Sequence, residues 1–227
     1  CNAVVDDFTS EWNGLGYSGT NSTNVTIVNS VFRHNRSGIV PNAGSYEGCA
    51  PPVTNSIVGN LVYDNGNQET SAIAVAAEFP GGGIIINGTN DSLIARNRAF
   101  GNKVAGIMVV PTPESDPIGA LTEAPDPNCV EDSVPLSDAE IAELPNPLVW
   151  HSLRNEVTGN VAEDNGEAGG WDIVSVEAAE NENCFADNEA GTFSPANLEE
   201  IAPCGGPFGE VVAESATLVA AIDSLQA

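Results

Sequence analysis

One short pattern recurs along the chain and constrains the fold more than any other feature. It consists of an aliphatic residue, two positions, Asn, four positions and a second Asn, followed soon afterwards by Gly and aliphatic residues. Clear copies begin at Ile57, Ile94 and Val157, and a variant with Ser in place of the first Asn begins at Ile27. Two degenerate copies lie at the ends, near residues 6–15 and 183–188. Self-similarity of this kind is typical of solenoids.

The spacing of the copies predicts the type of solenoid. The first Asn falls at residues 60, 97, 160 and 183, and Asp6 and Ser30 take the same register. The shortest steps, of 23 and 24 residues, fit one coil of three short strands and three turns. Such coils stack at ~4.8 Å with parallel strands, and Asn suits the bends between strands. We therefore predict an all-β, right-handed parallel β-helix of about six coils.

The same register predicts two columns of core residues. In each coil an aliphatic or aromatic side chain follows the first Asn position by two residues, and another follows the repeated Gly. Short β-branched runs between Asn and Gly are strands rather than helices. The first predicted column is Phe8, Phe32, Val62, Ala99, Ala162 and Phe185, and the second is Leu15, Ile39, Ile84, Ile107 and Ile173.

With this Asn/Gly/Ile pattern, the chain resembles the parallel β-helix repeat proteins of the pectate-lyase-like superfamily over roughly residues 1–204. The resemblance implies the fold but not one function, because the superfamily includes lyases, hydrolases, epimerases, phage tailspikes and non-catalytic surface proteins. The Asn-Thr-Asp, Gly-His-Gly and Arg-Ile-Lys motifs of polygalacturonase-like hydrolases are missing from the sequence. No catalytic residue can be assigned on this basis.

Several segments interrupt the repeat. The insertions 41–55 and 111–147 both follow a Gly-Ile strand, so we expect them to leave from one corner, and 66–82 from another. Within the second insertion, Ser137 to Glu140 form a capping box that predicts one short helix. Residues 205–227 carry a helix-like apolar stripe and would form a cap on the last coil or a frayed tail.

The five cysteines follow no C-x-x-C spacing, which favours disulfides of an exported protein over a zinc site, with scattered buried thiols as the alternative. Cys49 and Cys129 lie in the two insertions expected at one corner, and Cys184 and Cys204 bracket the last coil. We expect these two pairs to form disulfides, which leaves Cys1 over. Because the chain opens inside a coil, we expect a preceding N-terminal part of the same protein; a lipid-anchored Cys1 is the alternative.

The net charge of the chain disfavours some classes of binding partner. The chain carries 32 acidic and 6 basic side chains, a formal net charge of -26. That charge repels phosphate backbones and anionic lipid surfaces, so we expect no nucleic-acid partner. No apolar run approaches the ~18 residues of a spanning helix, so we expect no membrane span.

One outward-facing column is a candidate binding surface. Arg33, Tyr63, Phe100 and Glu163 all stand two positions before the second Asn of the repeat. Adjacent aromatic rings would form a stacking platform for sugars, to which Arg33 would add a cation–π contact. The alternative is that the 111–147 insertion packs on these side chains as a second small core.

A second column is a candidate metal site. His34, Asp64, Asp164 and Asp187 share the position directly before the second Asn, and Gly101 takes that position in the coil between Asp64 and Asp164. Carboxylates on one edge would bind Ca²⁺. However, Asp64 and Asp164 stand two coils apart, about 9.6 Å, so solvated turn aspartates are the alternative.

Two functions from different classes fit these observations. The first is a secreted or cell-surface solenoid that is not catalytic in this segment and binds glycans or acts as a rigid scaffold. The second is the C-terminal part of a carbohydrate-active enzyme, a polysaccharide lyase, glycoside hydrolase or epimerase. The small number of Arg and Lys residues disfavours uronate polymers as a substrate.

Overall fold

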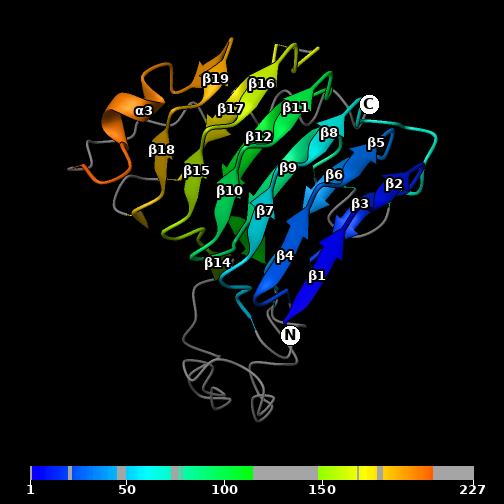
Figure 1. Ribbon diagram of the computed structural model, residues 1–227, viewed down its shortest axis with the longest axis horizontal. Coiled ribbons are helices and arrows are strands. Elements are labelled where there is room, and N and C mark those ends of the chain that lie inside the picture. Colours follow the sequence, from blue (N-terminus) through cyan, green and yellow to red (C-terminus); the bar gives the residue numbers. More distant parts are fainter. Residues whose placement is uncertain are drawn as a thin grey trace.

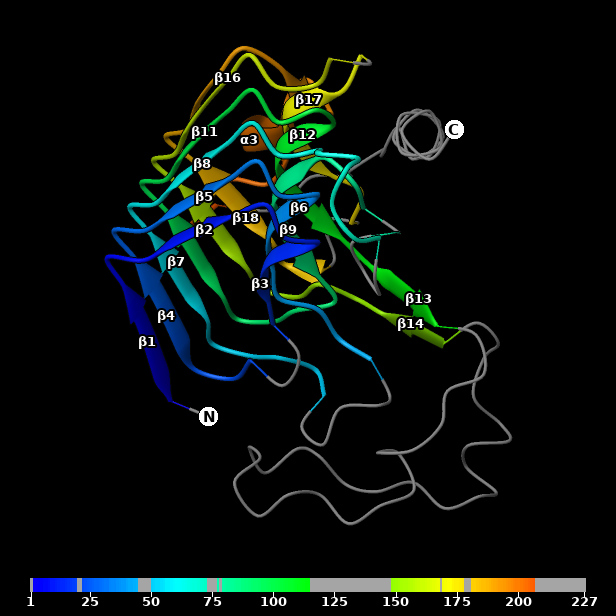
Figure 2. The same cartoon turned by 90° about the vertical axis from the view of Figure 1, so that its right-hand side faces the viewer.

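The computed structural model describes residues 2–19, 22–44, 50–72, 77, 79–114, 148–167, 169–177 and 181–206. These residues wind through six stacked coils, whose strands form three parallel sheets of six strands around one core (Figures 1 and 2). The prediction of a parallel β-helix is confirmed. Each coil contributes one short strand to each sheet, and each strand pairs with the equivalent strand of the next coil.

We call the three walls sheets A, B and C. Sheet A contains β1 (Ala3–Asp6), β4 (Val25–Val28), β7 (Ser56–Val58), β10 (Leu93–Ala95), β15 (Glu156–Thr158) and β18 (Cys184–Ala186). Sheet B contains β2 (Thr9–Glu11), β5 (Val31–Arg33), β8 (Leu61–Tyr63), β11 (Arg98–Phe100), β16 (Val161–Glu163) and β19 (Glu189–Ala190). Sheet C contains β3 (Leu15–Ser18), β6 (Ser37–Val40), β9 (Gly82–Asn87), β12 (Ala105–Val110), β17 (Trp171–Ser175) and β20 (Phe193–Ser194).

The insertions leave from the corners that the sequence predicts. Residues 41–55 connect β6 to β7 and residues 111–147 lie between β12 and β15, so both bridge sheets C and A. The described ends of the longer insertion pair as an antiparallel ribbon of β13 (Thr112–Glu114) and β14 (Leu148–Trp150). Residues 66–82 instead connect sheet B to sheet C. The helix predicted to begin at Ser137 and the apolar stripe of 205–227 lie outside the described residues, apart from residues 205 and 206.

Buried asparagines form hydrogen-bonded ladders at all three corners. Asn97 is typical: its Oδ1 accepts hydrogen bonds from the N and Nδ2 of Asn60 in the preceding coil, both at 3.0 Å. Its own N and Nδ2 donate to Oδ1 of Asn160 in the next coil, also at 3.0 Å. The rungs are Ser30, Asn60, Asn97, Asn160 and Asn188 between sheets A and B; Asn13, Asn35, Asn65, Asn102 and Asn165 between B and C; and Asn55, Ser92, Asn155 and Asn183 between C and A.

The ladders explain why the repeat combines Asn with Gly. The residue before each rung is left-handed, as in Gly59 at φ 67° and Gly159 at φ 60°, a conformation that glycine adopts without strain. The Gly that opens the sheet C strand has another role, because it makes room for the rung. A Cβ at Gly83 would lie 2.8 Å from Nδ2 of Asn102 and 2.5 Å from the carbonyl oxygen of Gly106.

The core columns are confirmed in the middle coils and wrong at the ends. In sheet B the inward column is Ser10, Phe32, Val62, Ala99, Ala162 and Ala190. Phe8 lies two residues from that register and is 48% exposed, whereas Phe185 is buried in sheet A opposite Val157. In sheet C, Tyr17 rather than Leu15 stands in line with Ile39, Ile84, Ile107 and Ile173.

The turn register is corrected at the same two ends. Phe8, not Asp6, takes the first position of the ladder, since its N donates to Oγ of Ser30 at 3.1 Å. Asn188 continues the ladder of Asn160, and Asn183 belongs to the corner between sheets C and A. The terminal steps are therefore 22 and 28 residues in place of the expected 24 and 23.

Carboxylates end two of the ladders near the last coil. Asp172 occupies the position that Gly holds in earlier coils, and its Oδ1 accepts from the N and Nδ2 of Asn165 at 3.0 and 2.9 Å. Glu199 of the short helix α3 (Leu198–Ile201) accepts from the N and Nδ2 of Asn188 in the same way. A carboxylate accepts several donors and brings none of its own, so no donor is left unsatisfied.

Candidate functional site: the outer face of sheet B

The outer face of sheet B presents two columns of side chains. Along each strand the middle residue is buried and its neighbours point outward. The first column mixes apolar and charged residues, and the second is an aromatic pair bracketed by charges. Their members are Thr9, Val31, Leu61, Arg98, Val161 and Glu189, and Glu11, Arg33, Tyr63, Phe100 and Glu163.

The rings of the aromatic pair stack on each other and do not form the flat platform that the sequence suggests. The rings of Tyr63 and Phe100 lie 4.7 Å apart at their centroids with an interplanar angle of 4°. This separation matches the distance between paired strands, so the ring planes lie across the solenoid axis. The two rings cover each other's facing surfaces and direct their edges outward.

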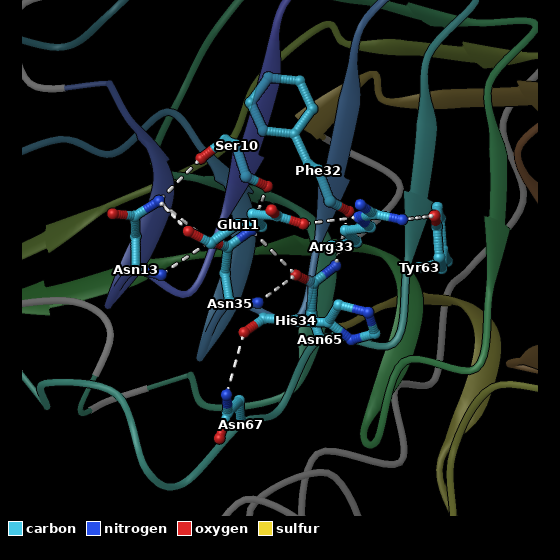
Figure 3. Close-up of polar contacts among 10 residues, drawn as sticks. All are labelled: Ser10, Glu11, Asn13, Phe32, Arg33, His34, Asn35, Tyr63, Asn65 and Asn67. Carbon is cyan, nitrogen blue, oxygen red and sulfur yellow. Dashed lines mark hydrogen bonds and ion pairs between the residues drawn. The ribbon is translucent and has the colours of Figure 1, made fainter.

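An arginine flanks each ring of the stack (Figure 3 shows the Tyr63 side). Arg33 donates from Nη1 to the hydroxyl of Tyr63 at 2.9 Å and from Nε to Glu11 at 2.8 Å, and its Cζ lies 5.9 Å from the ring centroid. The hydrogen bond to Tyr63, with that to Glu11, raises the pKa of Arg33. On the other side the Cζ of Arg98 lies 5.6 Å from the centroid of Phe100, and Arg98 pairs with Glu163.

Trp12 extends this face beyond what the sequence predicts. It stands directly before the rung Asn13, so it shares the corner column of His34 and Asp64. The indole lies 5.4 Å from the imidazole of His34, which in turn makes an edge contact with Tyr63 at 6.1 Å. Trp12 is 59% exposed, whereas Tyr63 and Phe100 are half-buried.

The candidate metal ligands do not form a cluster. Asp64 and Asp164 lie at the corner between sheets B and C, on either side of Gly101. The Asp64 carboxylate leans over that glycine, since a Cβ there would lie 2.5 Å from its Oδ1. Asp187 precedes Asn188 and so lies at the corner between sheets A and B. Among the described ranges, no group of three or more His, Cys, Asp or Glu residues could hold a metal ion, so the Ca²⁺ hypothesis stays a prediction.

One of the two predicted disulfides lies in the described part of the chain. Cys184 and Cys204 are bonded, which joins β18 to the segment after α3. Beside this bond the N of Phe185 donates to the carbonyl oxygen of Ala202 at 2.8 Å, so the segment covers the end of sheet A. Cys1, Cys49 and Cys129 lie outside the described residues.

The insertion was the alternative partner for the aromatic column. Its described ends, β13 and β14, stand at the corner between sheets C and A, away from sheet B (Figure 2). Residues 115–147 lie outside the described ranges, so the alternative stays open for them.

Comparisons with known proteins assign no family to this chain. In the described segments, no helix combines the length and hydrophobicity needed to cross a membrane. A scan of protein-family models, a search of curated proteins and a search of solved structures each gave no match.

Proposed function

We propose that this chain is an exported, non-catalytic β-helix solenoid that binds carbohydrate on the outer face of sheet B. The observation that carries the proposal is the exposed indole of Trp12 beside the column of Arg33, Tyr63 and Phe100. Exposed aromatic rings pack against the C–H faces of sugars, and guanidinium groups donate to hydroxyl oxygens. The resemblance to pectate-lyase-like proteins is compatible with such a ligand.

The charges on this face suit a largely neutral ligand. Arg33 and Arg98 are each paired with one glutamate, Glu11 and Glu163, so neither guanidinium presents an uncompensated positive charge. Each guanidinium has five N–H donors, and the two hydrogen bonds of Arg33 in Figure 3 use two of them. Hydroxyl groups of a glycan would accept from the other donors without breaking the ion pairs.

Export is the compartment that the chemistry favours. The Cys184–Cys204 disulfide is stable in an oxidising environment and is rare in reducing cytosol. The large acidic excess keeps a secreted or surface-exposed solenoid soluble and separate from its neighbours.

The test is a binding screen with immobilised polysaccharides, followed by affinity measurement on the best ligand. We expect Trp12→Ala to weaken binding about tenfold, equivalent to about 1.4 kcal/mol. Val4→Ala is the matched control, because Val4 is also an exposed apolar residue of the first coil but lies on sheet A. Binding that is insensitive to Trp12→Ala, or release of sugar fragments by the wild-type chain, would contradict the proposal.

A further inference from the structure

The sequence contains several Asn-x-Ser/Thr motifs, which are the acceptor signature for N-linked sugars. They begin at Asn21, Asn24, Asn35, Asn87 and Asn90. Such motifs arise readily in a chain rich in Asn and Thr, so the motif alone does not identify an acceptor. An N-linked sugar is bulky and has to project into solvent, so a folded molecule can carry it only on an exposed amide. The fold therefore selects among the motifs, and Asn21 lies outside the described residues.

Three of these motifs belong to the interior of the solenoid. Asn35 and Asn87 are 0% exposed and Asn90 is 8% exposed. The hydroxyl residues of the same motifs are also buried, and they are Ser37, Thr89 and Ser92. In Asn35, Nδ2 donates to the carbonyl oxygen of Ser10 at 3.1 Å and to Oδ1 of Asn65 at 3.3 Å, so both amide hydrogens are used. A sugar on that nitrogen would break the ladder.

Asn24 differs from these residues in both respects. It occupies the corner between sheets C and A with φ of 55°, directly before β4, and its side chain is exposed. Thr26, the hydroxyl residue of its motif, points outward from sheet A and is half-buried. Nδ2 of Asn24 donates to Oδ1 of Asn2 in the preceding coil. A sugar replaces one of the two amide hydrogens, so the other can keep this hydrogen bond.

The surroundings of Asn24 leave room for a neutral group. The equivalent corner positions in the coils before and after it are Asn2 and Thr54, which are exposed and uncharged. The same corner becomes charged further along the solenoid, at Asp91 and Arg154. Because sheet A separates this corner from sheet B, a sugar here would leave the outer face of sheet B uncovered.

We propose that Asn24 carries an N-linked oligosaccharide. In the transfer, Nδ2 of Asn24 forms a bond to C1 of the sugar and loses one proton. The bond between C1 and the phosphate of a polyprenyl-linked donor breaks, and the polyprenyl phosphate leaves. The inference rests on the export of the chain in the proposed function, because the motif is used on proteins that leave the cytoplasm. It does not depend on carbohydrate binding by sheet B.

Asn29 provides a matched control within the chain. It is also an exposed corner asparagine, with φ of 49°, and its Nδ2 donates to Oδ1 of Asp6 at 3.1 Å. Two residues later stands Val31, which has no hydroxyl group, so Asn29 is not part of an acceptor motif. Val31 is half-buried on the outer face of sheet B, as Thr26 is on sheet A. Val31→Thr would therefore complete the motif at Asn29 in a similar setting.

The test is peptide mass spectrometry, with electron-transfer fragmentation, of the chain purified from the organism that produces it. We expect a mass increase of whole sugar units on Asn24 and none on Asn29. Thr26→Val should remove the sugar, Thr26→Ser should retain it, and Val31→Thr should add a second sugar on Asn29. An unmodified Asn24, or a modification that persists in Thr26→Val, would overturn the inference. A sugar on Asn35 or Asn90 of the folded protein would contradict the argument from burial.

The location of the protein separates the two proposals. If the chain is found outside the cell with Asn24 unmodified, the inference about Asn24 is wrong and the proposed export stands. If the chain is found in the cytoplasm without sugar, both the export and the inference that rests on it are wrong. The effect of Trp12→Ala on polysaccharide binding tests the face of sheet B separately, because Trp12 and Asn24 lie at different corners.

Discussion

The outer faces of sheets B and C are built from the same repeat but differ in how much of their apolar surface is exposed to solvent. On sheet C the outward column of Val40, Ile85, Met108 and Val174 is fully buried and belongs to a second apolar cluster. On sheet B the outward residues stay in contact with water: Leu61 is 42% exposed, and Tyr63 and Phe100 are half-buried. An outward apolar residue in this solenoid is therefore structural on one wall and available for contact on another.

The neighbouring charges follow the same division. On sheet B the apolar residues are interleaved with Arg33, Arg98, Glu11 and Glu163, which pair across the coils. The second cluster on sheet C instead contains apolar side chains such as Val104, Val110 and Trp171. A face decorated with ion pairs remains soluble without a cover, whereas a purely apolar face has to be covered.

We expect the largest loss of stability from removal of a buried rung that supports sheets B and C together. Asn102 is a fully buried rung at the corner between sheets B and C. Its Oδ1 accepts from Asn65, and its Nδ2 donates to the carbonyl oxygen of Val62. Asn102→Ala leaves several buried groups without partners, at about 1–3 kcal/mol each, so we expect a loss of about 3–5 kcal/mol in the free energy of unfolding.

Urea denaturation followed by circular dichroism measures this loss. Asn13→Ala is the control, because Asn13 holds the same ladder position in the first coil but is exposed. We expect it to cost less than about 1 kcal/mol. Equal losses for the two variants would show that the rungs contribute through their local turn rather than through the ladder.

The second prediction compares the stability contributed by outward apolar residues on sheets B and C. Met108 on sheet C is fully buried and Leu61 on sheet B is 42% exposed. We expect Met108→Ala to lower the free energy of unfolding by about 2–5 kcal/mol, because it removes buried apolar area and leaves a cavity. Leu61→Ala should change it by less than about 1 kcal/mol. Comparable values from the same denaturation assay would mean that sheet B is covered in solution.

The smallest expected effect is a pH dependence of the free energy of unfolding that comes from Tyr17. This residue lies in the first coil, at the end of the inward column of sheet C. Burial raises the pKa of Tyr17, and a weaker hydrogen bond with Ser22 acts in the opposite direction. Because the folded pKa lies above that of the unfolded chain, Tyr17 adds stability below about pH 10, and this is lost as the pH rises further. Denaturation on both sides of pH 10 should show a larger drop for the wild type than for Tyr17→Phe. A larger drop in the variant would show that the sign is wrong.

The sequence predicts the middle coils well and misplaces the end coils for a physical reason. In the middle, Asn60, Asn97 and Asn160 are true rungs, so their spacing fixes the register. In the first coil Phe8 was aligned where Ser10 belongs, and Leu15 where Tyr17 belongs, each a slip of two residues. A shift of two keeps the alternation of inward and outward side chains, so hydrophobic periodicity cannot detect it.

The last coil shows a different ambiguity. Asn183 and Asn188 are rungs of neighbouring corners five residues apart, like Asn155 and Asn160. Each corner carries the same signature of a left-handed residue followed by Asn, so a slip of five residues moves the pattern from one corner to the next. The third ladder was missed because Ser92 replaces Asn in it.

The candidate site was predictable to the same extent as the register. Arg33, Tyr63 and Phe100 come from middle coils, and the structure aligns them as the repeat predicts. Glu11 and Trp12 were missed because the slip in the first coil assigned them to other positions.

The direction of the asparagine ladders has a consequence for synthesis on the ribosome. Each rung's N–H groups are accepted by the next coil, so a newly emerged coil satisfies the donors of the coil that left the ribosome before it. The solenoid can therefore grow vectorially, with one unsatisfied front that moves along as the chain lengthens. Asp172 and Glu199 close that front at two of the three corners, because they accept the last donors there and offer none. A nascent chain that ends before residue 172 therefore still exposes rung donors without acceptors at its growing end.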